Sequence, residues 1–287
     1  GINIYKIQVD SSASSGSGSS SSGSSTTDTS NGTVVTSFSE LTAAVTKAEK
    51  AGGGIVYVKG SSISCTAQLA LKASNANVSI IGVKNSDGTY PVLDFSAFRS
   101  AYIGKATTDS EVGIRISGSN YTIKNLIIQK APDNGIQIKG SSAGNNTIEN
   151  CIVRYNNDAG VQITGGAYSN TMRFVYSYRN CDVYTLGGNA DGFAPKLGAG
   201  KGNVFYGCYS WENSDDGWDS YDKDSLTYNL TYTNCACWNN GDPTIFTGQY
   251  DYNNGNALDT DLLLVELISK KDSSFASNYK KHTTYLP

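Results

Sequence analysis

Histidine, methionine and proline are scarce in this sequence, with one His, one Met and five Pro among 287 residues. The single histidine, His282, excludes a zinc site built from several histidines. Charged residues make up only 16% of the chain, and the formal net charge is −3. Nucleic-acid binders normally present a basic surface, and no apolar run approaches the ~20 residues of a membrane span. We therefore expect neither a nucleic acid nor a membrane as partner.

The abundant residues are those of turns and short strands. The chain has 31 Gly and 19 Tyr, together with many Asn, Ser and Thr. Gly, Asn, Ser and Thr favour turns and helix caps over helix interiors. The composition therefore predicts an all-β protein of many short strands joined by polar turns.

The six cysteines do not form a recognisable metal-binding pattern. They are Cys65, Cys151, Cys181, Cys208, Cys235 and Cys237. Cys235 and Cys237 are two residues apart, so on one strand they point to opposite faces and cannot easily pair. We expect most of the six to be buried as small hydrophobic side chains, with disulfides or a reactive thiol as alternatives.

The N-terminal part divides into two segments. Residues 1–10 alternate apolar and polar side chains, which predicts a strand left over from an upstream module or a segment unrelated to the domain. Residues 11–32 are mostly Ser and Gly and are typical of a flexible linker. No signal peptide follows Gly1, so we expect any export signal to have been removed or to lie upstream.

One helix is predicted, directly after the linker. Its apolar positions recur at helical spacing and are Phe38, Leu41, Ala44, Val45 and Ala48. Ser39 is the expected N-cap, and Gly52, Gly53 and Gly54 end the helix before a buried strand at residues 55–58. Such a helix would cover the open end of a repeat fold, which needs a cap to stay soluble.

From about residue 78 the sequence repeats. Equivalent segments begin at Tyr121, Asn146, Asn170, Asn203 and Leu230, with steps of 25, 24, 33 and 27 residues. An asparagine follows four of the strands at the same offset, at Asn156, Asn180, Asn213 and Asn240. Leucine-rich repeats of this length need leucines at fixed offsets, which are missing. The period predicts a parallel β-helix whose equivalent residues stack about 4.8 Å apart, with the Asn and Cys columns as ladders inside the coil.

A second column of the repeat collects acidic residues. Its members are the segments at 134–136, 159–161, 191–193 and 216–218. Asp191 and Asp216 are one rung apart in this column, so their Cα atoms should lie roughly 5 Å from each other. Asp215 and Asp219 flank the same corner, and four close carboxylates need a compensating cation. Calcium binds several oxygen ligands in irregular geometry, so the pattern predicts a calcium site. Turn capping by single Asp residues is the alternative.

The same residues carry a family resemblance. The segments at 189–197, 202–205 and 213–219, together with 90–95, resemble the core of polysaccharide lyase family nine, and the likeness extends over about residues 33–240. The resemblance implies a right-handed parallel β-helix solenoid and a secreted, calcium-dependent lyase that cleaves pectic polymers by β-elimination. It also implies that Asp191, Asp215, Asp216 and Asp219 hold the calcium, with a lysine as general base.

The sequence departs from the family at its C-terminal end. The family's catalytic lysine lies in a later rung, within a Gly-x-Gly-Phe-Lys-like segment that is missing here. After Asn240 the sequence repeat stops, and the pattern of residues 244–287 predicts an irregular region with one apolar stretch at 262–265. We therefore expect the β-helix domain at 33–287 to be truncated, and we assign no catalytic residue.

The remaining candidates are residues for substrate binding. Lys196 and Lys201 could bind a sugar carboxylate, and Trp218 could stack on a sugar, although solvated lysines and a packing tryptophan are the alternatives. The expected partner is an acidic plant cell-wall polysaccharide, pectate or a related uronate polymer, bound by a monomer that is part of a larger modular protein. A non-catalytic calcium-stabilised module that binds pectic polysaccharide is the alternative function. A glycoside hydrolase is less favoured, because hydrolases of this shape rely on a histidine and only His282 is present.

Overall fold

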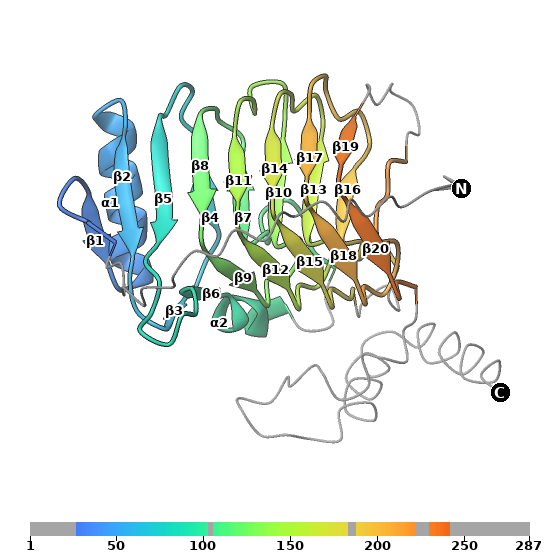
Figure 1. Ribbon diagram of the computed structural model, residues 1–287, viewed down its shortest axis with the longest axis horizontal. Helices are drawn as coiled ribbons and strands as arrows, with labels where there is room; N and C mark the ends of the chain where they lie inside the picture. Colours follow the sequence, from blue (N-terminus) through green and yellow to red (C-terminus); the bar gives the residue numbers. More distant parts are fainter. Residues whose placement is uncertain (1–26, 103–105, 183–187, 222–229, 242–287) are drawn as a thin grey trace, which may run out of the picture.

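The computed structural model describes residues 27–102, 106–182, 188–221 and 230–241. The chain winds into a coil in which each turn contributes short strands to three parallel sheets (Figure 1). Successive turns lie side by side along the coil axis, so residues about 25 positions apart in sequence are neighbours in space. The predicted parallel β-helix is confirmed.

The first sheet has eight strands. In spatial order they are β1 (Thr33–Val35), β2 (Gly54–Val58), β5 (Val78–Gly82), β8 (Tyr121–Lys124), β11 (Thr147–Glu149), β14 (Thr171–Arg173), β17 (Val204–Tyr206) and β19 (Thr231–Thr233). The second sheet has seven: β3 (Ser62–Ser64), β6 (Val92–Asp94), β9 (Ile127–Gln129), β12 (Ile152–Arg154), β15 (Tyr176–Tyr178), β18 (Tyr209–Trp211) and β20 (Ala236–Trp238). The third has five: β4 (Leu69–Leu71), β7 (Ile114–Ile116), β10 (Ile136–Lys139), β13 (Val161–Thr164) and β16 (Phe193–Pro195).

The strand register matches the sequence repeat. Thr147 of β11 pairs with Thr122 on one side and Thr171 on the other. Thr171 pairs with Val204, and Val204 pairs with Thr231. These are the partners that the repeat alignment predicts. A one-residue slip would turn every inward side chain to solvent, so burial of the apolar positions holds the register.

The core runs along the inside of the coil. Alternate residues of a strand point to opposite faces, and the inward ones stack on their equivalents in neighbouring turns. In the first sheet the inward column contains Ile123, Ile148, Met172 and Phe205, all fully buried. Fully buried side chains gain roughly 1.5–3 kcal/mol each over exposure, so the stack of turns is stabilised by packing between neighbours.

Two asparagine ladders occupy the inner corners. In the first, Asn146 Nδ2 donates to Asn170 Oδ1 at 2.9 Å, and Asn170 Nδ2 donates to Asn203 Oδ1 at 3.0 Å. The second ladder joins Asn156, Asn180, Asn213 and Asn240 with distances of 2.8 to 2.9 Å. Each side chain also accepts a hydrogen bond from a backbone N–H of the preceding turn. The ladders satisfy polar groups that would otherwise be buried without partners, and they confirm the predicted asparagine columns.

The corner between the first and second sheets has a left-handed backbone conformation in five successive turns. Positive φ angles occur at Asn125, Asn150, Phe174, Gly207 and Asn234, between 51° and 60°. Glycine and asparagine adopt this conformation most readily. Their recurrence at corners in the sequence therefore has a backbone cause.

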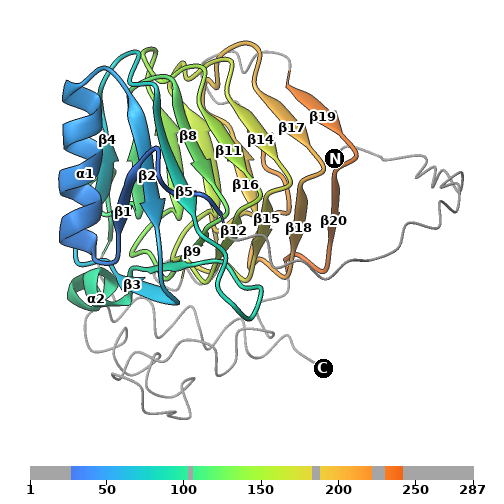
Figure 2. The same cartoon turned by 60° about the vertical axis from the view of Figure 1, so that its left-hand side comes forward.

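One end of the coil is covered by α1 (Phe38–Lys50), which packs on β2 (Figure 2). The helix buries Leu41, Ala44 and Val45, as predicted. The predicted N-cap was wrong, because Ser37 and not Ser39 caps the helix. Ser37 Oγ accepts from the Glu40 N–H at 3.3 Å, and the Glu40 carboxylate accepts from the Ser37 N–H at 3.2 Å. This reciprocal pair needs Glu three residues after the cap, and only Ser37 has one.

A short helix follows β6, a strand of the second sheet. Between β6 and β7, α2 (Ser96–Arg99) and the 3₁₀ turn η1 (Ser100–Tyr102) lie beside the lower strands in Figure 1. Arg99 Nη1 donates to the Tyr155 carbonyl at 2.8 Å, so this excursion is attached two turns further along the coil.

Four of the six cysteines are buried free thiols: Cys65, Cys151, Cys181 and Cys208. Cys235 is half-buried and Cys237 is exposed, and both are free as well. The expectation that most cysteines pack as small hydrophobic residues is confirmed. The expected strand at 1–10, most of the linker at 11–32 and the region from 244 to 287 lie outside the described residues. Among the described helices, none is long and apolar enough to cross a membrane.

Candidate metal centre

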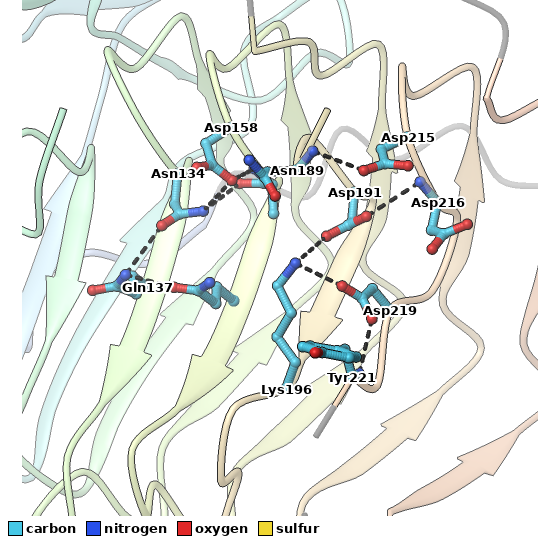
Figure 3. Close-up of polar contacts among 12 residues, drawn as sticks. Asn134, Gln137, Asp158, Asn189, Asp191, Lys196, Asp215, Asp216, Asp219 and Tyr221 are labelled. Carbon is cyan, nitrogen blue, oxygen red and sulfur yellow. Dashed lines mark hydrogen bonds and ion pairs between the residues drawn. The ribbon is translucent and has the colours of Figure 1, made fainter. Parts of the chain in front are cut away.

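The acidic corner lies between the second and third sheets, where two successive turns leave β15 and β18. Gly192 N–H donates to the Asp216 carbonyl at 2.9 Å, and Phe193 pairs with Trp218 in a parallel bridge. Asp191 and Asp216 are therefore vertical neighbours in adjacent turns, as the repeat predicts. The Asp216 N–H also donates to Asp191 Oδ1 at 3.2 Å, which links the two residues directly (Figure 3).

Gly192 makes the close approach of this corner to the second sheet possible. A Cβ atom at this position would lie 1.8 Å from Ser210 Oγ and 2.9 Å from Asn213 Nδ2. No side chain fits there, because Ser210 and Asn213 belong to the fixed inner corner of the next turn. Glycine at position 192 therefore allows the backbone to pack against Ser210 and Asn213, which positions the preceding residue, Asp191.

Burial dominates the electrostatics of Asp191. The residue is 0% exposed, and burial raises the pKa of its carboxyl to about 7 against the opposing effect of Lys196. Asp216 is exposed, and partial desolvation followed by repulsion from Asp215 and Asp219 raises its pKa above the usual range. The site is thus short of positive charge and changes from buried at Asp191 to open at Asp216.

Three carboxylates converge closely enough to hold one cation. Oxygen atoms of Asp191, Asp215 and Asp216 lie within 4.8 Å of one another. Asp215 is fixed from the neighbouring turn, since its Oδ2 accepts from the Asn189 N–H at 2.7 Å. Calcium takes six to eight oxygen ligands at about 2.3–2.6 Å and tolerates irregular geometry. The donor set is all oxygen and partly solvent-accessible, so these residues fit a calcium ion.

Asp219 has different partners from the other three. Its Oδ2 accepts from Lys196 Nζ at 2.6 Å, and its Oδ1 accepts from the Tyr221 N–H at 2.8 Å. Asp219 stands in the same column as Gln162 and Gln137, two residues past the glycine of each turn. It lies beside the three-carboxylate group, with an ammonium between it and Asp191.

Lys196 bridges two of the predicted metal ligands. Its Nζ lies 2.9 Å from Asp191 Oδ2 and 2.6 Å from Asp219 Oδ2, and only 10% of the side chain is exposed (Figure 3). Burial opposes the positive charge, but the two carboxylates outweigh it and hold the pKa of Lys196 above its usual range. The two ion pairs therefore favour the charged form of Lys196 in this arrangement.

The other two candidate substrate residues are Trp218 and Lys201. The Trp218 ring stacks on Phe193 with centroids 4.3 Å apart, meets Phe205 edge to face at 5.2 Å, and packs against the core. Lys201 is exposed on the turn between β16 and β17, past the end of β16 that is away from Asp191, and its carbonyl accepts from the Ser169 N–H. These contacts give Trp218 a packing role, while contact of either residue with substrate stays a prediction.

The sequence reasoning missed a polar network on the preceding turns. Gln137 Nε2 donates to Gln162 Oε1 at 2.6 Å and to Asn134 Oδ1 at 3.1 Å, and Asn134 Nδ2 donates to Asp158 Oδ1 at 3.1 Å (Figure 3). Burial, followed by repulsion from Asp133, raises the pKa of Asp158 well above its usual range. A signal existed in the sequence, because Asp133, Asp158 and Asp215 each stand two residues before the glycine of their turn.

Comparisons with known proteins agree with the observed fold. A family model described as "Pel9A-like, right handed beta helix region" matches residues 22–258. Pectate lyase L of Paenibacillus polymyxa (strain SC2) is 32% identical over 253 residues, covering 84% of this chain and 54% of the relative. Pectate lyase L of Dickeya chrysanthemi is 31% identical over 141 residues, covering 49% of this chain and 27% of the relative.

A solved structure supports the same relation. The crystal structure of pectate lyase Pel9A superposes with a TM-score of 0.56 at 28% identity, covering 71% of this chain and 48% of that one. The chain spans about half the length of the Paenibacillus relative and of the Pel9A chain. Because the family model matches most of the chain and the strands form a parallel β-helix, the chain belongs to the Pel9A-like right-handed β-helix family and is homologous to pectate lyases.

Proposed function

We propose that this chain is the β-helix part of a secreted, calcium-dependent lyase that cleaves pectate or a related uronate polymer by β-elimination. One observation carries the proposal: the buried carboxylate of Asp191 meets Asp215 and Asp216 within 4.8 Å at a corner that opens to solvent. The homology to pectate lyases supplies the substrate class. The proposed protein is a monomer within a larger modular protein.

The proposed metal ligands are Asp191, Asp215, Asp216 and Asp219. Hydrogen bonds across the turns orient the side chains of Asp191 and Asp215 at this corner. When bound, calcium would attach to the carboxylate of a uronate sugar and withdraw charge from it, which acidifies the neighbouring C5 proton. Asp216, as the exposed member, stands where solvent and polymer can reach the group.

The chain's own residues bind and orient the polymer in this proposal. Lys196 carries a positive charge next to the metal group and can attract a uronate carboxylate. Lys201 and Trp218 are further candidate contacts. The ion pairs with Asp191 and Asp219 favour the charged form of Lys196, and we assign no general base.

An activity assay tests the proposal. The chain is incubated with polygalacturonate and calcium while ultraviolet absorbance and new reducing ends are followed together. A calcium-dependent rise in absorbance reports the unsaturated product of a lyase. Reducing ends without that absorbance would show hydrolysis and refute the proposed reaction.

Binding without either signal would favour the second candidate, a calcium-stabilised module that binds pectic polysaccharide without cleaving it. Asp216→Ala separates this outcome from accidental binding, because it removes one carboxylate of the cluster. Polymer retention should then lose its calcium dependence. Asp87→Ala, which removes an exposed carboxylate in a distant loop, is the matched control and should leave retention unchanged.

A further inference from the structure

Lys196 supplies a positive charge to the acidic corner. It follows β16 directly, and its ammonium lies between Asp191 and Asp219 at 2.9 and 2.6 Å. The Asp191 carboxylate is 1% exposed and the Lys196 side chain is 10% exposed, so water screens this contact little. A carboxylate buried this deeply needs a partner, and Lys196 provides one from within the chain.

The ammonium and a metal ion would need the same carboxylate. Asp191 Oδ1 accepts from the Asp216 N–H, and Asp191 Oδ2 accepts from Lys196. Asp191 is also the buried member of the three-carboxylate group that fits calcium. A divalent ion held by that group would share the Asp191 carboxylate with the Lys196 ammonium, and the two positive charges would repel each other.

We propose that Lys196 is a built-in counter-cation that competes with calcium for Asp191 and Asp219. The ammonium neutralises part of the cluster when metal is absent and gives up its carboxylates when metal binds. Lys196 thereby weakens the affinity for calcium and lets the corner stay folded without it. This inference rests on the proposed function, since it takes calcium as the metal of this cluster.

A positioning role predicts the opposite result. If Lys196 served only to hold Asp191 and Asp219 in place for the metal, removing it would disorder the ligands and weaken calcium binding. Competition predicts tighter binding, because one repelling charge and one rival partner are removed together. The two roles therefore differ in the sign of a single measurable quantity.

Calorimetric titration with calcium chloride, on the full chain freed of metal, measures that quantity. Lys196→Met keeps the length of the side chain and removes its charge. Competing sites are typically coupled about 5- to 150-fold, so we expect the variant to bind calcium roughly tenfold more tightly. We also expect it to melt at a lower temperature than wild type in chelator, with calcium restoring most of the loss.

Lys139→Met is the matched control. Lys139 lies on the same face of the third sheet, two turns earlier, and its ammonium pairs with Asp109 at 2.5 Å. The control therefore also removes one positive charge and one ion pair, but not at the cluster. Its calcium affinity should stay within about twofold of wild type, since exposed charges a Debye length of about 8–10 Å away are largely screened.

The outcomes separate the two proposals. If wild type binds calcium and Lys196→Met binds it equally or more weakly, competition is refuted while the metal site stands. If only the variant binds, competition is supported and the calcium requirement of the natural chain fails. If neither binds, both proposals fall.

A measurement on the unaltered chain covers the case of a variant that does not fold. In a crystal structure of wild type soaked with calcium, Lys196 Nζ should lie more than 4 Å from the Asp191 and Asp219 oxygens. An ammonium that keeps both ion pairs beside a bound calcium ion would overturn the proposal.

Discussion

Removing one rung of the inner asparagine ladder should destabilise the coil by several kcal/mol. In Asn146→Ala the Tyr121 N–H loses its acceptor, Asn146 Oδ1, at 3.0 Å. The Gly118 carbonyl loses its donor, Asn146 Nδ2, at 3.1 Å. Asn146 is 0% exposed, so water does not replace either partner without a rearrangement.

The magnitude follows from counting the groups left without partners. A buried donor or acceptor without a partner costs about 1–3 kcal/mol, so two such groups cost about 2–6 kcal/mol. A loss of about 4 kcal/mol lowers the midpoint of thermal unfolding by roughly 8–16 °C in a domain of this size. Unfolding of a repeat fold can proceed in steps, so the effect should be largest for the turns on either side of Asn146.

Two readouts test this reasoning. Thermal unfolding followed by circular dichroism gives the global effect, and hydrogen exchange of the Tyr121 amide gives the local one. Asn145→Gly is the matched control, because it removes the adjacent asparagine side chain at an exposed corner with φ of 56°, which glycine adopts freely. The reasoning is refuted if Asn146→Ala loses no more stability than the control and the Tyr121 amide stays protected.

Three further predictions concern Asp158, Gly192 and the cap of α1. Burial and Asp133 raise the pKa of Asp158, so the folded state keeps this proton at a pH where the unfolded chain has lost it. The free energy of unfolding should therefore fall as pH rises from about 4, by at most about 1.4 kcal/mol per pH unit. Urea unfolding at several pH values should show a smaller decrease for Asp158→Asn than for wild type. Gly192→Ala would bring a Cβ atom within 1.8 Å of Ser210 Oγ, so we expect the free energy of unfolding to fall by at least about 1–3 kcal/mol. An unchanged urea midpoint of unfolding would contradict the close packing at Gly192. Ser37→Ala should lower the free energy of unfolding by about 1 kcal/mol through loss of the capping box, whereas Ser39→Ala should change it very little. Equal losses for the two variants in thermal melting would contradict Ser37 as the N-cap.

The arrangement at the corner explains how an acidic group can persist in a protein of net negative charge. Asp191 is buried, yet it has the Asp216 N–H and Lys196 as partners. Asp215 has a backbone N–H of its own. Hydrogen bonds and one ammonium therefore compensate the inner carboxylates, while Asp216 is exposed to solvent.

The repeat by itself determined the fold and much of the site. Equivalent positions about 25 residues apart become strand partners, because the side-chain period and the burial of inward residues allow one register only. The repeat alone therefore places Asp191 above Asp216 and puts the asparagines into ladders. It could also have placed Trp218 inside, since that residue stands in the same column as Ile136, Val161 and Phe193.

Only the tertiary structure decided where long side chains and local caps go. The Lys196 side chain is long and flexible, and from its position in the sequence the ammonium could reach either solvent or the carboxylates. In the structure it pairs with the buried carboxylate of Asp191. Burial of Asp158 likewise depends on what the neighbouring turns place over it. Periodicity specifies which residues are neighbours, whereas the partner of each charge follows from the dielectric and the shape that the folded turns create around it.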